Sequence, residues 1–259
     1  MIKKNRRCFF CTVIIILFLL ISDASSETIK YAVFPAPPYM IGADYEKSAL
    51  SGIDIEIFNE IAKRANFEVE YIRCPWIRAL ELMKSGKADI LSSVYRKPER
   101  EEFMIYFDKP FLSELPIAFF YRKDSGISIK KYSDLYRYQN IAVLRGASYF
   151  PEFDSDPRIS KYSVASQEQI FPMLIHRRIQ VMAGYMPTEN YFITVNNYGD
   201  IIEKSPFTYN EKSKVYMTIS KKSPLAKKIN LLNKINNDLY NEGFTAKIVN
   251  KYYSRYRLK

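Results

Sequence analysis

Residues 53–94 read IDIEIFNEIAKRANFEVEYIRCPWIRALELMKSGKADILSSV, and this stretch decides the fold. Ile53, Ile57, Ile61 and Ala65 recur at helical spacing and make one face of residues 53–65 apolar, which predicts an amphipathic helix. Residues 67–72 alternate between apolar and polar side chains, which predicts a half-buried strand. The stretch therefore begins with a helix that leads into a strand.

The second half of the stretch repeats this order. Pro75 can open a second helix, which Gly86 ends. Residues 88–94 are mostly apolar and predict a buried strand, and the β-branched and apolar residues at 29–34 predict another. The resulting order of strand, helix, strand, helix and strand indicates a mainly parallel sheet with helices on its faces.

The rest of the chain contains a second α/β unit. Further strands are predicted at 117–121, 140–144, 181–185 and 215–219, followed by a long amphipathic helix from 225 to about 243 and a short helix over 244–253. Polar crossings near 122–125 and 210–214 separate the units. We therefore predict two lobes with a cleft between them, lobe 1 being 27–121 with 214–259 and lobe 2 being 122–213.

The composition is that of a globular protein. Of the 259 residues, 47% are hydrophobic and 26% charged, which excludes a disordered tail or a collagen-like fibre. The net charge is +11: residues 27–220 hold equal numbers of basic and acidic residues, the first 26 residues carry +3 and the segment 221–259 carries the other +8. This segment predicts a solvated basic helix face, and we expect no nucleic acid among the partners.

The first 26 residues resemble a secretory signal peptide. A basic start is followed by an apolar run over 13–21 and then by small residues. The alternative is a retained membrane anchor, although the run is about half of the ~20 residues that span a bilayer. Because Cys8 and Cys11 precede the apolar run, the segment does not fit a lipid anchor. We expect a protein free in the periplasm of a Gram-negative cell.

Few residues are available for catalysis. Removal of the signal peptide leaves Cys74 as the one cysteine, which excludes an internal disulfide and predicts a small buried side chain. His176 is the only histidine and is expected on the exposed side of a helix. The sequence contains no catalytic triad, metal-ligand cluster or phosphate loop around them, so we expect no enzyme, cofactor or metal.

Several short motifs occur in a specific order. They are Pro37-Pro38-Tyr39, Ser51-Gly52-Ile53-Asp54, Trp76-Ile77-Arg78-Ala79-Leu80, Ser85-Gly86-Lys87-Ala88-Asp89-Ile90, Lys97-Pro98-Glu99-Arg100, Phe107-Asp108-Lys109-Pro110-Phe111, Leu144-Arg145-Gly146-Ala147-Ser148 and Asn241-Glu242-Gly243-Phe244. Together they resemble the extracellular solute-binding proteins of family 3 over residues 27–253. The resemblance implies an α/β fold of the two-lobed periplasmic binding protein type (type II), closing on a small polar solute, often an amino acid. It implies delivery to the membrane subunits of an ABC transporter, and we expect a monomer.

The resemblance implies that Arg100 holds the carboxylate of the ligand. A planar guanidinium offers two parallel donors to a carboxylate and keeps its charge, so the residue type suits this role. Arg100 also follows the predicted strand at 88–94, and ligands bind outside the carboxyl ends of such strands. The alternative is a surface arginine paired with Glu99 or Glu101.

Other candidates surround the predicted cleft. Backbone N–H groups of Gly146, Ala147 and Ser148 could hold an anionic group if a helix opens there, the alternative being an ordinary N-cap by Ser148. Further contacts could come from Ser93, Tyr95, Tyr39 and Trp76, although aromatic residues so placed are as often core.

One position departs from the family pattern. Amino-acid binders of the family place an aspartate in lobe 2 to take the ligand's ammonium, and the corresponding position here holds Tyr185. Since a phenol does not neutralise a cation at pH 7, a carboxylate without an α-ammonium becomes an alternative ligand. Glu189 could substitute for the aspartate. Two alternative functions remain, an exported dehydratase-like enzyme and a sensing module for a membrane receptor.

Overall fold

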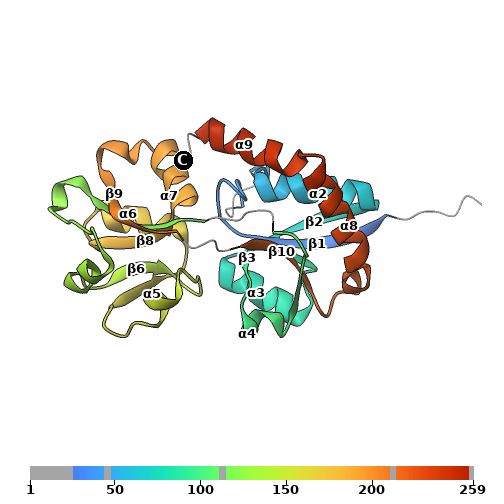
Figure 1. The fold of residues 1–259 in the computed structure, drawn as a ribbon, viewed down its shortest axis with the longest axis horizontal. Coiled ribbons are helices and arrows are strands. Elements are labelled where there is room, and N and C mark those ends of the chain that lie inside the picture. Colours follow the sequence, from blue (N-terminus) through green and yellow to red (C-terminus); the bar gives the residue numbers. More distant parts are fainter. Residues whose placement is uncertain (1–25, 44–47, 111–114, 211–213, 257–259) are drawn as a thin grey trace, which may run out of the picture.

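The structure is a computed structural model, and it describes residues 26–43, 48–110, 115–210 and 214–256. The chain forms two lobes side by side, each built on a five-stranded sheet (Figure 1). The predicted two-lobed α/β fold is therefore confirmed.

The first lobe contains the strands nearest the N-terminus. Its sheet has the order β2-β1-β3-β10-β4, with β1 Glu27–Val33, β2 Phe67–Arg73, β3 Ile90–Tyr95, β4 Met104–Tyr106 and β10 Val215–Ser220. Strand β1 is parallel to β2 and β3, as the strand-helix-strand pattern predicts. Strand β10 is antiparallel to β3 and β4, because it returns from the other lobe, so the sheet is mixed.

The helices of the first lobe follow the predicted pattern. They are α2 Ile53–Ala65, α3 Trp76–Ser85, α4 Pro98–Glu101, α8 Ile229–Asn241 and α9 Phe244–Tyr256. Helix α2 buries the isoleucine face that predicted it. Asn66 and Gly86 end α2 and α3 in the left-handed conformation, with φ of 57° and 76°, which an amide side chain and a glycine tolerate best.

The second lobe is a separate packing unit. Its sheet has the order β7-β6-β8-β5-β9, with β5 Ile117–Arg122, β6 Ile141–Leu144, β7 Lys161–Val164, β8 Val181–Tyr185 and β9 Ile202–Tyr209. Three helices accompany it, α5 Pro151–Ser155, α6 Gln167–Ile175 and α7 Met186–Val195. Successive residues of β5 alternate between two hydrophobic clusters, Phe119 joining one and Phe120 the other. The sheet is therefore covered on both faces.

The predicted boundary at residue 121 is wrong. Strand β5 pairs with β8 and β9 and lies in the second sheet, so the chain passes between the lobes after β4 and before β5. It returns between β9 and β10. The polar residues at 122–125 form a turn (Lys123–Ser125) at the end of β5 inside the second lobe. A polar run after a buried strand indicates that the strand ends there. It does not by itself indicate that the chain passes to the other lobe.

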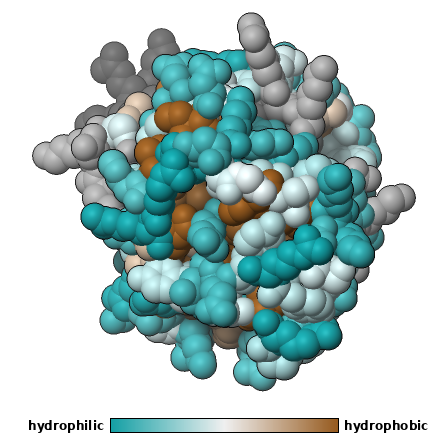
Figure 2. Space-filling model, turned by 90° about the vertical axis from the view of Figure 1, so that its left-hand side faces the viewer, coloured by the Kyte–Doolittle hydropathy of each residue, from teal (hydrophilic) through white to brown (hydrophobic). Residues whose placement is uncertain are grey.

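The outer end of the second lobe is mainly hydrophilic, and hydrophobic residues show there only in narrow strips (Figure 2).

In the first lobe, the basic residues of α8 and α9 face solvent, as predicted. Lys234 pairs with Asp238 and Lys251 with Glu56, both at 2.8 Å. These side chains form a solvated helix face rather than a concentrated basic groove.

The predicted signal peptide lies outside the described residues, apart from Ser26. In the described part of the chain, no helix is long and apolar enough to cross a membrane. Cys74 is buried, as predicted, and burial raises the pKa of its thiol to about 11. His176 is exposed at the end of α6.

Candidate ligand-binding site between the lobes

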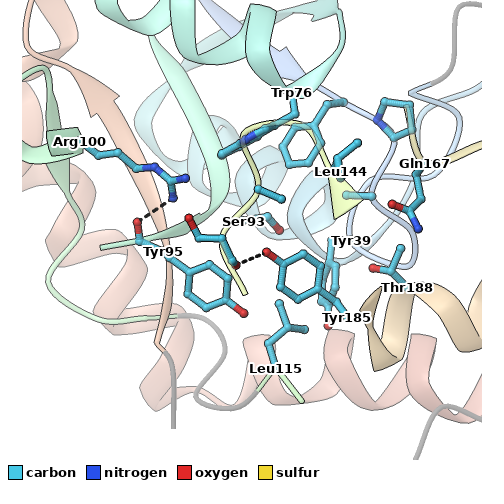
Figure 3. A pocket seen from close by; sticks show the side chains of 15 residues that line it. Tyr39, Trp76, Ser93, Tyr95, Arg100, Leu115, Leu144, Gln167, Tyr185 and Thr188 are labelled. Carbon is cyan, nitrogen blue, oxygen red and sulfur yellow. Dashed lines mark hydrogen bonds between the residues drawn. The ribbon is translucent and has the colours of Figure 1, made fainter. Parts of the chain in front are cut away.

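Both lobes contribute to one pocket of about 600 Å³, a volume that includes its open mouth (Figure 3). Its lining residues are Phe34, Pro35, Ala36, Tyr39, Trp76, Ser93, Tyr95, Arg100, Leu115, Leu144, Ala147, Ser148, Gln167, Tyr185 and Thr188. Eight of the nine residues predicted from the sequence lie in this set. The ninth, Gly146, lies directly behind it, and its carbonyl accepts a hydrogen bond from Trp76 Nε1 at 3.0 Å.

Arg100 is the charged group of the pocket. It follows β3 on the short helix α4, and only 6% of it is exposed. Its Nη1 donates to the carbonyl oxygen of Tyr95 at 3.2 Å, and its guanidinium carbon lies 5.2 Å from the centre of the Trp76 ring. The ion pairs of the described residues do not include Arg100. A buried cation with no carboxylate in contact is costly, and an anion in the pocket would offset this cost.

The alternative of a surface arginine is wrong. Glu99 lies 4.0 Å from Lys97 Nζ, and Glu101 lies 3.1 Å from Arg96 Nε. Both carboxylates are thus engaged by the neighbouring basic residues on the outside of the turn. Arg100 points inward instead.

Ser93 is held by a buried carboxylate. Its backbone is left-handed (φ 57°), where the pairing of β3 with β10 is irregular. Its Oγ donates to Asp54 Oδ2 at 2.8 Å, and Ser92 donates to the same oxygen. Burial raises the pKa of Asp54 to about 7, against the lowering effect of both serines. Because the hydroxyl group of Ser93 donates its hydrogen bond to Asp54, its oxygen can act only as an acceptor toward the pocket.

Tyr185 occupies the end of β8 where the family resemblance implies an aspartate. Its hydroxyl donates to the carbonyl oxygen of Ser148 (Figure 3). Its ring stacks on Tyr149, with centroids 5.4 Å apart, and lies 5.9 Å from the ring of Tyr95. Burial raises the pKa of Tyr185 above its usual value, so the phenol is neutral at pH 7.

The loop after β6 does not open a helix, so two predictions about it are wrong. The N–H of Ala147 donates to the carbonyl of Leu144 at 3.1 Å, which makes a turn, and α5 begins only at Pro151 with Phe150 as N-cap. Proline favours the first position of a helix, which fixes the start there. Residues 146–148 therefore form neither a helix N-terminus for an anion nor an N-cap by Ser148.

Among the polar lining residues, sequence reasoning missed Gln167, which opens α6, and Thr188 in α7. Strand β7 is parallel to β6, and Gln167 lies in the connection after its carboxyl end. A ligand-contacting position is expected there, but β7 itself is too short and polar to be recognised. Glu189, the suggested substitute for the missing aspartate, does not line the pocket.

The lining carries an unbalanced charge. Among the described residues that line the pocket, Arg100 alone is charged at pH 7. The described residues contain no group of three or more histidine, cysteine, aspartate or glutamate side chains that could hold a metal ion.

Two α/β lobes that enclose a pocket between them have the fold of the two-lobed periplasmic binding proteins. The sequence model of the bacterial extracellular solute-binding proteins, family 3, matches residues 29–255. The protein belongs to this family, as the motifs predict.

Two curated relatives resemble the chain. A probable histidine-binding protein of Campylobacter jejuni is 27% identical over 90 residues, which is 35% of each protein. The L-cystine-binding protein TcyA of Bacillus subtilis is 23% identical over 214 residues, which covers 81% of this chain and 75% of that protein. The chain thus aligns with only about a third of the length of the first relative.

Solved structures share the fold. A mutant of the arginine-binding protein ArgBP of T. maritima has a TM-score of 0.74 and 20% identity, covering 88% of this chain and 95% of that protein. The ancestral amino-acid-binding protein AncCDT-1, a precursor of cyclohexadienyl dehydratase, has a TM-score of 0.71 and 20% identity, covering 87% and 95%. At these identities the likeness establishes the fold.

Proposed function

We propose that this protein captures a small carboxylate-bearing solute, an amino acid or a related acid, by closure of its two lobes. It works in the periplasm and delivers the solute to the membrane subunits of an ABC transporter. The relatives that carry names for binding histidine, cystine and arginine support the class of ligand.

The observation that carries the proposal is the environment of Arg100. Its guanidinium lies in the pocket between the lobes, buried and stacked on Trp76, and its one hydrogen bond among the described residues is to a backbone carbonyl. A carboxylate in the pocket would supply the missing counter-charge and accept two parallel hydrogen bonds. Tyr39, Leu115 and Leu144 would cover the apolar part of the same ligand.

A ligand screen tests the proposal. Amino acids, organic acids, polyamines and sugars are added to the purified protein, and an increase in melting temperature identifies those that bind the folded state. We expect carboxylates among the compounds that raise it. If only sugars or polyamines do so, the proposed ligand class is wrong.

Arg100→Ala tests the assigned residue. Removing the guanidinium leaves the bound carboxylate buried and unpaired, which typically costs about 2–5 kcal/mol, so binding should weaken more than tenfold by calorimetry. The melting temperature of the ligand-free variant should change little, because Arg100 has no ion pair to lose. Arg100→Lys should restore only part of the affinity, since an ammonium does not make two parallel bonds. Unchanged binding in Arg100→Ala would remove Arg100 from the site.

The fate of the bound compound separates binding from catalysis. The proposal expects each compound to be recovered unchanged by mass spectrometry after prolonged incubation. Turnover of prephenate-like or arogenate-like acids would instead favour the dehydratase alternative, for which the fold of AncCDT-1 provides a precedent. Binding without transport, but with signalling through a membrane receptor, would favour the sensing module.

A further inference from the structure

The pocket ends opposite Arg100 in a buried pair of polar side chains, Gln167 and Glu189. Gln167 opens α6 and lines the pocket, whereas Glu189 lies in the first turn of α7 and is 1% exposed. Nε2 of Gln167 lies 2.8 Å from Glu189 Oε1 and 2.7 Å from Oε2. The carboxyl group thus stands behind the amide, away from the ligand space.

The backbone of β8 makes room for this pair. A Cβ atom at Gly184 would lie 2.3 Å from Glu189 Cγ and 2.5 Å from its Oε1. Such distances are closer than atomic contact allows, so only glycine permits the glutamate to fold back against the strand. Glu189 is consequently enclosed between β8 and Gln167.

The contact with Glu189 fixes which end of the amide faces the ligand. Nε2 of Gln167 donates to Glu189, and the carbonyl oxygen of a carboxyl group accepts hydrogen bonds whether or not the group is protonated, so the NH₂ group of Gln167 turns toward Glu189 and its own carbonyl oxygen points the other way. In Figure 3 the amide oxygen lies on the side of the pocket and the nitrogen away from it. This end of the pocket therefore offers a hydrogen-bond acceptor.

The acceptor suits a neutral donor better than a cation. Within the described lining, Arg100 is the one charged side chain, so a ligand ammonium would add a second positive charge without a carboxylate in contact. Burial also raises the pKa of Glu189 to about 8, which leaves the group behind Gln167 largely uncharged at pH 7.

We propose that the site selects carboxylates that also carry an uncharged O–H or N–H donor, which the carbonyl of Gln167 accepts. Arg100 holds the carboxylate and Glu189 is a positioning residue that orients the amide. This inference rests on the proposed function, because it needs a carboxylate bound at Arg100.

Two series of matched acids test the proposal by calorimetry at pH 7. In the first, phenyllactate carries a hydroxyl donor, phenylpyruvate replaces it by a carbonyl and phenylalanine by an ammonium. In the second series the varied group lies further from the carboxylate. Succinamate carries an amide N–H donor, levulinate a ketone carbonyl and γ-aminobutyrate an ammonium group. In at least one of the two series, we expect the acid with the O–H or N–H donor (phenyllactate or succinamate) to bind about tenfold more tightly than the acids that carry a carbonyl or an ammonium group in its place.

Variants separate positioning from general structural effects, because the measured quantity is the ratio of affinities within a series. Gln167→Ala should reduce the preference for the donor acid to less than about threefold. Glu189→Leu should do the same, and Glu189→Gln, which keeps one acceptor oxygen, should retain part of the preference. Gln180→Ala, at an exposed glutamine, is the control and should retain all of it.

Each other outcome has a defined meaning. Equal binding of donor and oxo acids, tightest binding of the ammonium acids, or a preference that survives in Gln167→Ala would overturn the inference. If acids bind through Arg100 but the donor acids are not preferred, the inference about Gln167 is overturned and the proposed function stands. If no acid of either series binds but the screen identifies another carboxylate, the inference is overturned and the proposed function stands; if no carboxylate binds at all, both are overturned.

Discussion

At the scale of single residues, Tyr185 lies where the family resemblance implies an aspartate for the ammonium group of the ligand. Its phenol is neutral, bonds to the backbone of Ser148 and stacks on Tyr149. The substitution Tyr185→Asp replaces this phenol at the end of β8 by a carboxylate. Relative to lactate and phenyllactate, alanine and phenylalanine should then gain about tenfold in affinity, because a charged hydrogen bond replaces an unpaired ammonium.

Tyr185→Phe is the matched control for that substitution. It removes the hydroxyl and keeps the ring, so the relative affinities for amino and hydroxy acids should stay as in the parent protein. If Tyr185→Asp also leaves them unchanged, position 185 does not contact the α-substituent.

Glu189 should make stability fall as pH rises. Burial raises the pKa of its carboxyl from 4.5 to about 8 in the folded protein, whereas the unfolded chain titrates near 4.5. Between these values the folded state holds a proton that the unfolded state has released. The stabilisation is complete below pH 4.5 and is lost toward pH 8, at up to about 1.4 kcal/mol per pH unit.

Urea denaturation of the parent protein and of Glu189→Gln between pH 5 and 9 measures this effect. The variant lacks the titrating group, so it should lose less stability over the range. The titration of Asp54 changes the stability of both proteins equally, so it cancels when the two stability curves are compared. Parallel stability curves would place the pKa of Glu189 in its ordinary range.

At the scale of elements, the turn after β6 meets α3 across the cleft. Gly146 has φ of 72°, and a Cβ there would lie 2.2 Å from Ile77 Cδ1. Gly146→Ala should therefore oppose closure and weaken ligand binding by about tenfold. Ile77→Ala in the same chain should restore part of the affinity, because it removes the atom that collides.

Gly126 provides the control for backbone strain. Its φ is 70°, and nothing lies within 4 Å of the position a Cβ would take. Gly126→Ala should thus lower stability by about 1 kcal/mol, as any such residue does, and leave ligand affinity unchanged. Equal affinity losses in both variants would argue against a cross-lobe contact.

Elements with a clear period were predictable from the sequence. Helix α2 was predicted over residues 53–65, its observed bounds, because isoleucine at every fourth position has no other buried arrangement. Strands β4, β7 and β9 were missed, since they are short or rich in polar residues and depend on neighbouring strands. The same dependence hid Gln167 and the lobe to which β5 belongs.

The place of Arg100 in the pocket could be predicted because its position after a buried strand and its residue type agree. The pair of Gln167 and Glu189 could not be found in this way. Their sequence separation is 22 residues, and their contact depends on Gly184, whose missing side chain carries no signal of its own in a single sequence.

At the scale of the whole molecule, the lobes touch at several points around the pocket. Trp76 bonds to Gly146, and Lys97 lies 4.0 Å from Asp154 at the rim. On the opposite side, α9 runs from the first lobe toward α7 of the second (Figure 1), where the rings of Tyr256 and Tyr191 are 4.7 Å apart. The chain passes between the two sheets once after β4 and once after β9, so we expect the lobes to rotate as rigid bodies when these contacts open.

The aromatic contact of α9 should bias the balance between open and closed forms. Tyr256→Ala removes it from outside the pocket, so the ligand-free protein should show a larger radius of gyration by small-angle scattering than the parent. Because a smaller closed fraction lowers the apparent affinity by the same factor, binding of the acids found in the screen should weaken several-fold. A saturating concentration of the bound acid should give the parent protein and Tyr256→Ala the same compact scattering profile. The control is Tyr162→Ala, at an exposed tyrosine of β7, which should behave like the parent protein. A scattering profile that is unchanged by both ligand and Tyr256→Ala would mean that the lobes form a static scaffold.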